Sequence, residues 1–362
     1  MKKEDLRIVF LGTPDFAVES LRRIHEGGYN IVGVVTMPDK PAGRGHKLLH
    51  SPVKQYAVEH GLHLMQPPRL KADDFVEELR SLNANLFVVI AFRMLPEVVW
   101  SMPELGTFNL HASLLPKYRG AAPINWAVIN GDTETGVTTF FLKHEIDTGD
   151  ILRQERIEIR PEDNVGDVHD RLMMLGAELT LDTIEHIIAE DLRPIPQDEI
   201  LQGAEPTPAP KIFKETCRID WTRKAVEVHN LVRGLSPYPA AWTEIVDGEA
   251  EPMSAKIFET AVVESGAEMH PGKITIDGNR LLVDCADARI EILSLQAAGK
   301  KRMPAADFLR GSRFTAPKCV LNRIKYFRYS YKKSNDHWSL LFLSVMLGEK
   351  FVQIITPLNQ LK

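Results

Sequence analysis

The chain has 362 residues, of which 44% are hydrophobic and 26% charged, and its formal net charge is −5. This length is too great for one ordinary hydrophobic core and the composition is that of a soluble globular protein, so we expect two domains. The acidic balance argues against non-specific phosphate binding, and the three widely spaced cysteines, which form no paired motif, argue against a disulfide framework or a metal site.

The apolar runs of the chain are short. Residues 8–11 are too few for the core of a signal peptide, and residues 340–347 are too few to span a bilayer. We therefore expect a cytoplasmic protein with no membrane partner.

The first half of the chain alternates between strand and helix patterns. Buried strands are predicted at residues 6–12, 29–36 and 86–91, and helices after residue 15 and at residues 51–60 and 72–82. This order predicts an α/β domain with a Rossmann-like, doubly wound, mainly parallel sheet. Ligands of such sheets bind beyond the carboxyl ends of the strands, so residues 91–96 are a candidate site.

The second half changes character after a long predicted helix at residues 164–190. Five prolines fall within residues 191–210, which we interpret as a stiff extended linker between a first domain, residues 1–190, and a second. Short alternating runs separated by turn signals predict a small, OB-like β-barrel at residues 211–317. Residues 318–362 are an atypical tail, interpreted as a disordered extension or as sequence from outside the original reading frame.

Polar residues of the kinds that take part in catalysis gather in the central segment. Asn109 and His111 are two residues apart, so in an extended strand their side chains point the same way. Asp147 follows in a short acidic turn. Each has an ordinary alternative as a turn cap, a core histidine or a turn residue, and the residues alone support the catalytic and structural interpretations about equally.

The run from Asn109 to Gly120, followed by Asp147-Thr148-Gly149, resembles the signature of the 10-formyltetrahydrofolate-dependent formyltransferases. Matching segments occur in the family's order at residues 10–14, 38–45, 113–123, 218–221, 237–239 and 295–301. The resemblance covers about residues 6–315, and it is to the branch of the family whose acceptor is methionyl-tRNA. The tail lies outside it.

This resemblance implies an enzyme of translation initiation. It would transfer the formyl group of 10-formyltetrahydrofolate, a co-substrate, to the α-amine of methionine on initiator tRNA, without a covalent intermediate or a metal. Asn109 and His111 would donate hydrogen bonds to the oxyanion formed by direct amine attack. Asp147 would favour the charged imidazole and accept the amine proton.

The resemblance also implies binding residues. The predicted folate contacts are Ser113, Leu114, Leu115, Pro116, Phe92 and Arg93, although residues 91–96 lack the glycine that is common in the family. The predicted tRNA contacts are Lys40, Arg44 and Lys47, in a basic loop suited to phosphates. The second domain would bind tRNA as well, and we expect a monomer.

Two alternatives remain open. A UDP-aminosugar formyltransferase also has a small second domain, but that family tends to read Arg-Gly-Arg-Ala-Pro where this chain reads Arg119-Gly120-Ala121-Ala122-Pro123. A non-catalytic tRNA-binding relative is the other alternative, and the intact set of Asn109, His111 and Asp147 argues against it.

Overall fold

A computed structural model describes residues 1–42, 47–263, 268–312, 314–321, 330–331, 340–347 and 350–357. The chain divides into two compact units. The first comprises Met1–Arg218, His229–Trp242 and Lys256–Thr260, and the second comprises Ile219–Val228, Thr243–Ala255 and Ala261–Lys362.

The first unit is built on a seven-stranded sheet with the order β10-β9-β7-β6-β1-β2-β5. Its strands are β1 (Arg7–Gly12), β2 (Asn30–Val35), β5 (Leu64–Met65), β6 (Leu86–Ile90), β7 (Thr107–His111), β9 (Glu134–Phe141) and β10 (Ile151–Glu158). The first five run parallel, β9 runs antiparallel to β7, and β10 runs antiparallel to β9. The mainly parallel α/β sheet predicted from the sequence is confirmed.

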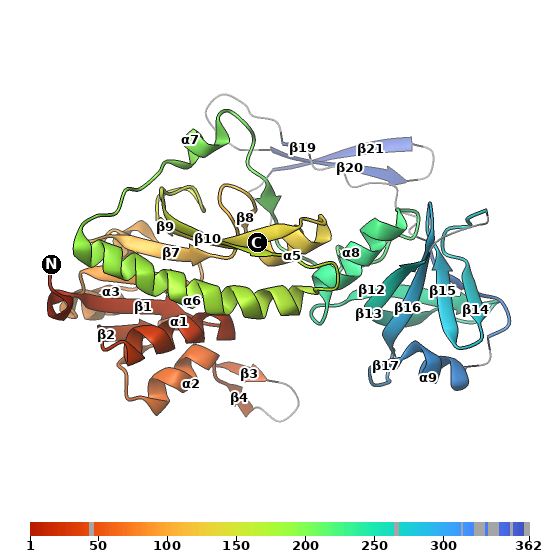
Figure 1. Ribbon diagram of the computed structural model, residues 1–362, viewed down its shortest axis with the longest axis horizontal. Helices are drawn as coiled ribbons and strands as arrows, with labels where there is room; N and C mark the ends of the chain where they lie inside the picture. Colours follow the sequence, from red (N-terminus) through yellow and green to blue (C-terminus); the bar gives the residue numbers. More distant parts are fainter. Residues whose placement is uncertain are drawn as a thin grey trace. The chain divides into compact units, whose positions relative to one another are not determined.

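Helices cover both faces of this sheet (Figure 1). Helices α1 (Asp15–Glu26) and α6 (Val165–Ala189) share a core with Ile8 and Phe10, whereas α3 (Asp73–Ser81) shares a core with Val9 and Leu11. Successive side chains of β1 therefore enter opposite cores, which explains its uninterrupted apolar run. The other helices of this part are η1 (Lys3–Asp5), α2 (Pro52–Glu59), α4 (Glu97–Trp100), α5 (Pro123–Ile129) and α7 (Gln197–Leu201).

Helix α6 lies close to the strand that carries the central motif. It begins at a capping box, in which Asn164 accepts backbone N–H bonds from Gly166 and Asp167, and the Asp167 carboxylate accepts the Asn164 N–H. A Cβ placed on Gly176 would lie 2.7 Å from Leu110 Cδ2. The glycine thus permits the close approach of α6 to β7.

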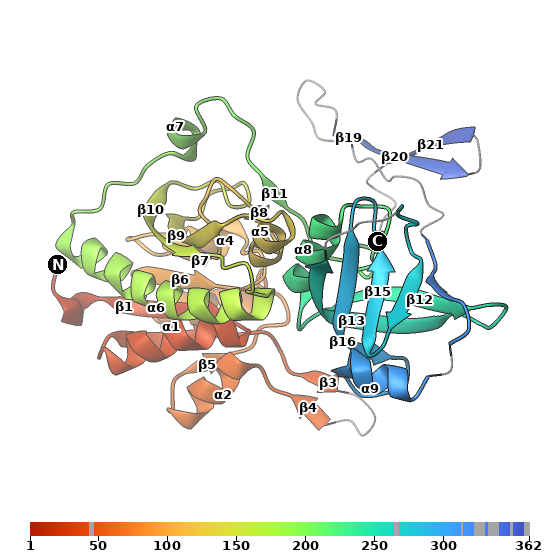
Figure 2. The ribbon, with the colours of Figure 1, turned by 45° about the vertical axis from the view of Figure 1, so that its right-hand side comes forward.

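The second unit contains most of a small antiparallel barrel (Figure 2). Its strands run in the order β14-β15-β16-β13-β12-β18, and β17 pairs with β16. A bridge between Lys273 and Lys318 and a 2.7 Å bond from the Cys319 N–H to the Gly272 carbonyl bring its edges together, so the predicted barrel is confirmed. Three elements have residues in both units, namely α8 (Ala225–Leu235), β12 (Ala241–Asp247) and β13 (Met253–Val263). The others are β14 (Ile274–Asp277), β15 (Arg280–Asp284), β16 (Arg289–Ala297), β17 (Met303–Pro304), α9 (Ala305–Arg310) and β18 (Pro317–Cys319).

The proline-rich residues 191–210 differ from the extended linker that the sequence predicts, because they pack on the first unit. Ile195 and Ile151 exchange two backbone hydrogen bonds of 2.8 Å. Strand β11 (Pro208–Ala209) pairs in parallel with β8 (Arg119–Gly120). The carbonyls of Thr207 and Ala209, which flank Pro208, accept the N–H groups of Arg119, Ala121 and Ala122.

Of the tail, the structure describes β19 (Ser330–Tyr331), β20 (Leu340–Leu347) and β21 (Lys350–Pro357), which form an antiparallel sheet. The remaining tail residues after Leu321 lie outside the described residues. Among the described helices, none is both long enough and apolar enough to cross a membrane.

Candidate functional site

A cavity of about 840 Å³ opens in the first unit where β1, β6 and β7 end. This volume lies within the usual range for small-molecule sites. Its lining includes Pro14, Phe16, Lys71, Val89, residues 91–97, Trp100, residues 109–112, residues 120–125, residues 142–147 and His169. The cavity therefore contains Asn109, His111 and Asp147 together.

Asn109 and His111 come from β7, whose register with β9 places them opposite Phe140 and Thr138. The His111 side chain is buried, and its ring is nearly perpendicular to that of Phe140 at a centroid distance of 6.4 Å. Its Nε2 atom lies 2.8 Å from the Tyr118 carbonyl oxygen. A carbonyl only accepts hydrogen bonds, so Nε2 carries a proton and Nδ1 is the atom left for the cavity.

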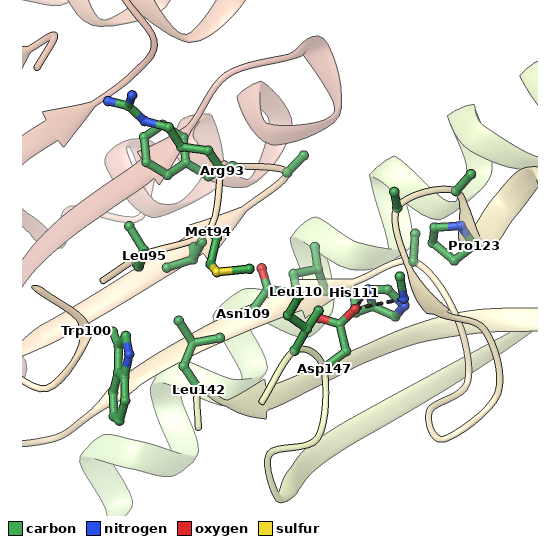
Figure 3. A pocket seen from close by; sticks show the side chains of 18 of the residues that line it. Arg93, Met94, Leu95, Trp100, Asn109, Leu110, His111, Pro123, Leu142 and Asp147 are labelled. Carbon is green, nitrogen blue, oxygen red and sulfur yellow. Dashed lines mark hydrogen bonds and ion pairs between the residues drawn. The ribbon is translucent and has the colours of Figure 1, made fainter. Parts of the chain in front are cut away.

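Asp147 faces this ring from the turn after β9 (Figure 3). Its Oδ2 atom lies 3.9 Å from His111 Nδ1 and accepts the Gly120 backbone N–H at 2.9 Å. Asp147 has a φ of +55°, in the left-handed region, which costs a non-glycine residue about 1–3 kcal/mol. Surrounding contacts must therefore hold the turn in place.

Gly149 contributes to this turn through the space it leaves. A Cβ placed on Gly149 would lie 1.6 Å from the Phe141 carbonyl oxygen. The chain therefore doubles back against β9 immediately after Asp147, and only glycine fits there.

Phe92 and Arg93, two of the predicted folate contacts, line the cavity. The Arg93 guanidinium points away from Asn109 and His111 (Figure 3), and it donates to the carbonyls of Pro67 and Pro68. Burial lowers the pKa of Arg93. The arginine thus ties the loop after β6 to a neighbouring loop of the same unit.

The other four predicted folate contacts, Ser113–Pro116, are not among the residues that line the cavity. Ser113 is buried and donates through Oγ to the Lys117 carbonyl at 2.6 Å. Leu115 packs with Phe140 and Ile151, and Leu114 lies against Gly136. Their prediction as direct contacts stays a prediction that this geometry does not favour.

Of the predicted tRNA contacts, Lys40 and Lys47 begin the two strands of a hairpin, β3 (Lys40–Ala42) and β4 (Lys47–Leu49). Lys40 is exposed, the side chain of Lys47 is not described, and Arg44 lies outside the described residues. The base of the hairpin is anchored by Asp39, which binds Lys54 at 2.5 Å. Hydrogen bonds from Lys54, Gln66 and His50 hold the pKa of the Asp39 carboxyl well below its usual range.

Sequence reasoning missed part of the cavity. Trp100 and Leu142, which it did not name, supply apolar surface. Met94, which is 72% exposed and lies within the predicted residues 91–96, points toward Asn109 (Figure 3). Trp100 ends the four-residue helix α4 and Leu142 follows β9, and neither segment is long enough to show a periodic pattern. Among the described residues, no group of three or more His, Cys, Asp or Glu is arranged to hold a metal ion.

Comparison with known proteins identifies relatives of both domains. The formyl transferase family profile matches residues 6–184, and the profile of the formyl transferase C-terminal domain matches residues 211–313. Methionyl-tRNA formyltransferase of Bacteroides fragilis is 60% identical over 316 residues, covering 87% of this chain and 98% of the relative. The enzyme of the same name from Bacteroides thetaiotaomicron is 58% identical, with the same coverage.

Solved structures share the fold at low sequence identity. An N-formyltransferase from Helicobacter canadensis, in complex with folinic acid and dTDP-3-aminofucose, aligns with a TM-score of 0.57 and 19% identity over 79% of this chain and 98% of that one. HypX from Aquifex aeolicus, in complex with tetrahydrofolic acid, aligns with a TM-score of 0.57 and 18% identity over 91% of this chain and 52% of that one.

Proposed function

The chain belongs to the methionyl-tRNA formyltransferases of the formyl transferase family, and on this premise we propose how its cavity joins a formyl donor to an amine. The enzyme formylates methionyl-tRNA. We propose 10-formyltetrahydrofolate as the donor and the α-amine of methionine on initiator tRNA as the acceptor. The products are formyl-methionyl-tRNA and tetrahydrofolate, for translation initiation in the cytoplasm.

The lining of the cavity suits such a donor. Val89, Leu95, Trp100 and Leu142 supply apolar surface for a flat aromatic ring system. The polar groups Asn109, His111 and Asp147 gather in one part of it. An apolar wall with a few convergent polar groups favours a donor that is held by its rings and reacts at one end.

The proposed reaction is direct attack of the amine on the formyl carbon. The new C–N bond pushes an electron pair onto the formyl oxygen, and the side chains of Asn109 and His111 donate hydrogen bonds to that oxyanion. One such donor contributes about 3 kcal/mol. The amine proton passes to the Asp147 carboxylate, directly or through water, and collapse of the intermediate releases the folate nitrogen, which takes up a proton.

The hydrogen bond between the His111 ring and the Tyr118 carbonyl is the observation that carries this proposal. Nε2 already donates to the Tyr118 carbonyl, so the ring can donate toward the cavity only when Nδ1 is protonated as well. The ring thus lies between the Tyr118 carbonyl and the Asp147 carboxylate, whose Oδ2 atom is 3.9 Å from Nδ1. In the proposed mechanism the ring donates through Nδ1 at the place where negative charge develops.

His111→Ala tests the proposal. Turnover is expected to fall on the order of 10²- to 10³-fold, because one oxyanion donor is lost, while affinity for methionyl-tRNA stays unchanged. Single-turnover formylation and equilibrium tRNA binding measure the two effects. His63→Ala is the matched control, since His63 is half exposed and pairs with Glu78 outside the cavity. Near-normal turnover of His111→Ala would refute the mechanism.

A further inference from the structure

Helix α7 brings a buried polar side chain to the Asp147 turn from a distant part of the chain. Gln197, the first residue of α7, is 2% exposed. Its Nε2 group donates to the Asp147 carbonyl at 2.9 Å and to the Gly149 carbonyl at 2.8 Å. One amide thus spans the turn on both sides of Thr148.

The oxygen of the same amide is also satisfied. Gln197 Oε1 accepts from Arg119 Nε at 3.0 Å and from Arg119 Nη2 at 2.7 Å. Both N–H groups and the carbonyl oxygen of the glutamine are therefore bonded within the protein. A fully bonded buried amide fixes its partners firmly, because any displacement leaves polar groups without partners.

These bonds close a ring through three segments. Arg119 holds Gln197, Gln197 holds the Asp147 main chain, and the Asp147 carboxylate accepts the N–H of Gly120, the residue after Arg119. The pairing of β8 with β11 fixes Arg119 and Gly120 in turn. The strained backbone of Asp147 is thereby held from its carbonyl and from its carboxylate.

We propose that Gln197 is a positioning residue, which sets the place of the Asp147 carboxylate relative to His111 Nδ1. Gln197 is not among the residues that line the cavity, so it acts through Asp147 and not on the substrates. The inference rests on the proposed role of Asp147. It predicts an effect on the chemical step and none on substrate binding.

Gln197→Met preserves the approximate volume of the side chain and removes all four hydrogen bonds. Its kcat is expected to fall about 10- to 100-fold, as for a misplaced catalytic group, with unchanged KM values for the folate and for methionyl-tRNA. Glu199→Gln is the matched control, because Glu199 is an exposed residue of the same helix. Arg119→Lys keeps Gln197 but removes the two guanidinium N–H groups that donate to its Oε1 atom. If Gln197→Met does not fold, Arg119→Lys is tested in its place, with the same expected fall in kcat.

The decisive comparison uses the Asp147→Ala background. There Gln197→Met is expected to cause no further loss of kcat, because the group that it positions is gone. If the fold-losses of kcat in the two single variants multiply in the double variant, or if Gln197→Met alone raises KM, the role of Gln197 is structural and the proposal is overturned. If Asp147→Ala itself kept normal turnover, the proposed function of Asp147 would fail instead, so the two failures are distinguishable.

Discussion

At the scale of single residues, the orientation of His111 depends on Tyr118, whose main chain and side chain both form hydrogen bonds. Tyr118 presents its carbonyl to Nε2, while its phenol donates to Asp132 at 2.9 Å and accepts from Asn130 at 3.1 Å. Burial raises the pKa of Tyr118 to about 12, so the phenol stays protonated and keeps donating at neutral pH. The imidazole therefore has a defined proton on Nε2 before any substrate arrives.

The sequence predicted only part of this arrangement. The two-residue spacing places Asn109 and His111 on one side of β7, and the structure brings both into one cavity with Asp147. The Tyr118 carbonyl and Gln197 leave no pattern in the sequence. The first is a main-chain acceptor, which any residue would supply, and the second lies 50 residues from Asp147 in a segment interpreted as a linker.

Gly149→Ala tests the packing of the Asp147 turn. The added Cβ meets the Phe141 carbonyl, so the turn must shift, at a cost of about 1–3 kcal/mol of unfolding free energy. A shift of about 1 Å in Asp147 should reduce kcat on the order of a hundredfold. Denaturant unfolding and single-turnover rates measure both effects. Gly311→Ala, whose Cβ would meet nothing closer than 3.7 Å, should change neither. Normal activity of Gly149→Ala would contradict a rigid turn.

At the scale of elements, long periodic segments were predictable and very short ones were not. Helix α6 has 25 residues and a capping box, so its pattern is unambiguous. Strands β8 and β11 have two residues each, and their pairing joins positions about ninety residues apart. Such a pair depends on the folded sheet around it, because two residues carry no periodicity of their own.

The β3–β4 hairpin is predicted to contact the phosphates of tRNA. Arg44→Ala removes one cation from the sequence between β3 and β4 and should weaken methionyl-tRNA binding most at low salt. Each lost phosphate contact lowers the slope of log K against log salt concentration by about 0.9. The ratio of wild-type to variant affinity should therefore shrink about threefold between 50 and 200 mM salt. Equilibrium binding across a salt series measures it. Arg80→Ala, at an exposed arginine of α3, is the control. A deficit independent of salt would mean that Arg44 does not contact a phosphate.

At the scale of the whole molecule, the match to the family profile and the last strand of the barrel end within a few residues of each other in the sequence. The C-terminal family profile ends at residue 313, and β18 completes the barrel at Cys319. The tail adds eight Lys or Arg and only two acids beyond residue 317. The division into two domains was predictable from the change in sequence pattern. The packing of residues 195–209 on the first unit was not predictable. A high density of prolines indicates extended backbone but does not indicate which segment that backbone pairs with.

A chain ending at Leu321 should keep its activity. It retains both family matches and every strand of the barrel, so turnover with methionyl-tRNA and the thermal midpoint are expected to be unchanged. Comparison of the truncated and full chains in the same formylation assay measures this. A selective rise in KM for tRNA would assign the basic tail to acceptor binding instead.

The identity of the acceptor is the central claim, and one assay tests it most directly. The purified full-length protein is incubated with 10-formyltetrahydrofolate and either methionine-charged initiator tRNA or a UDP-aminosugar, and the formylated products are measured. We predict formyl-methionyl-tRNA in the first reaction, its loss with His111→Ala, and no formylated sugar in the second. Formylated sugar without formyl-methionyl-tRNA would contradict the account.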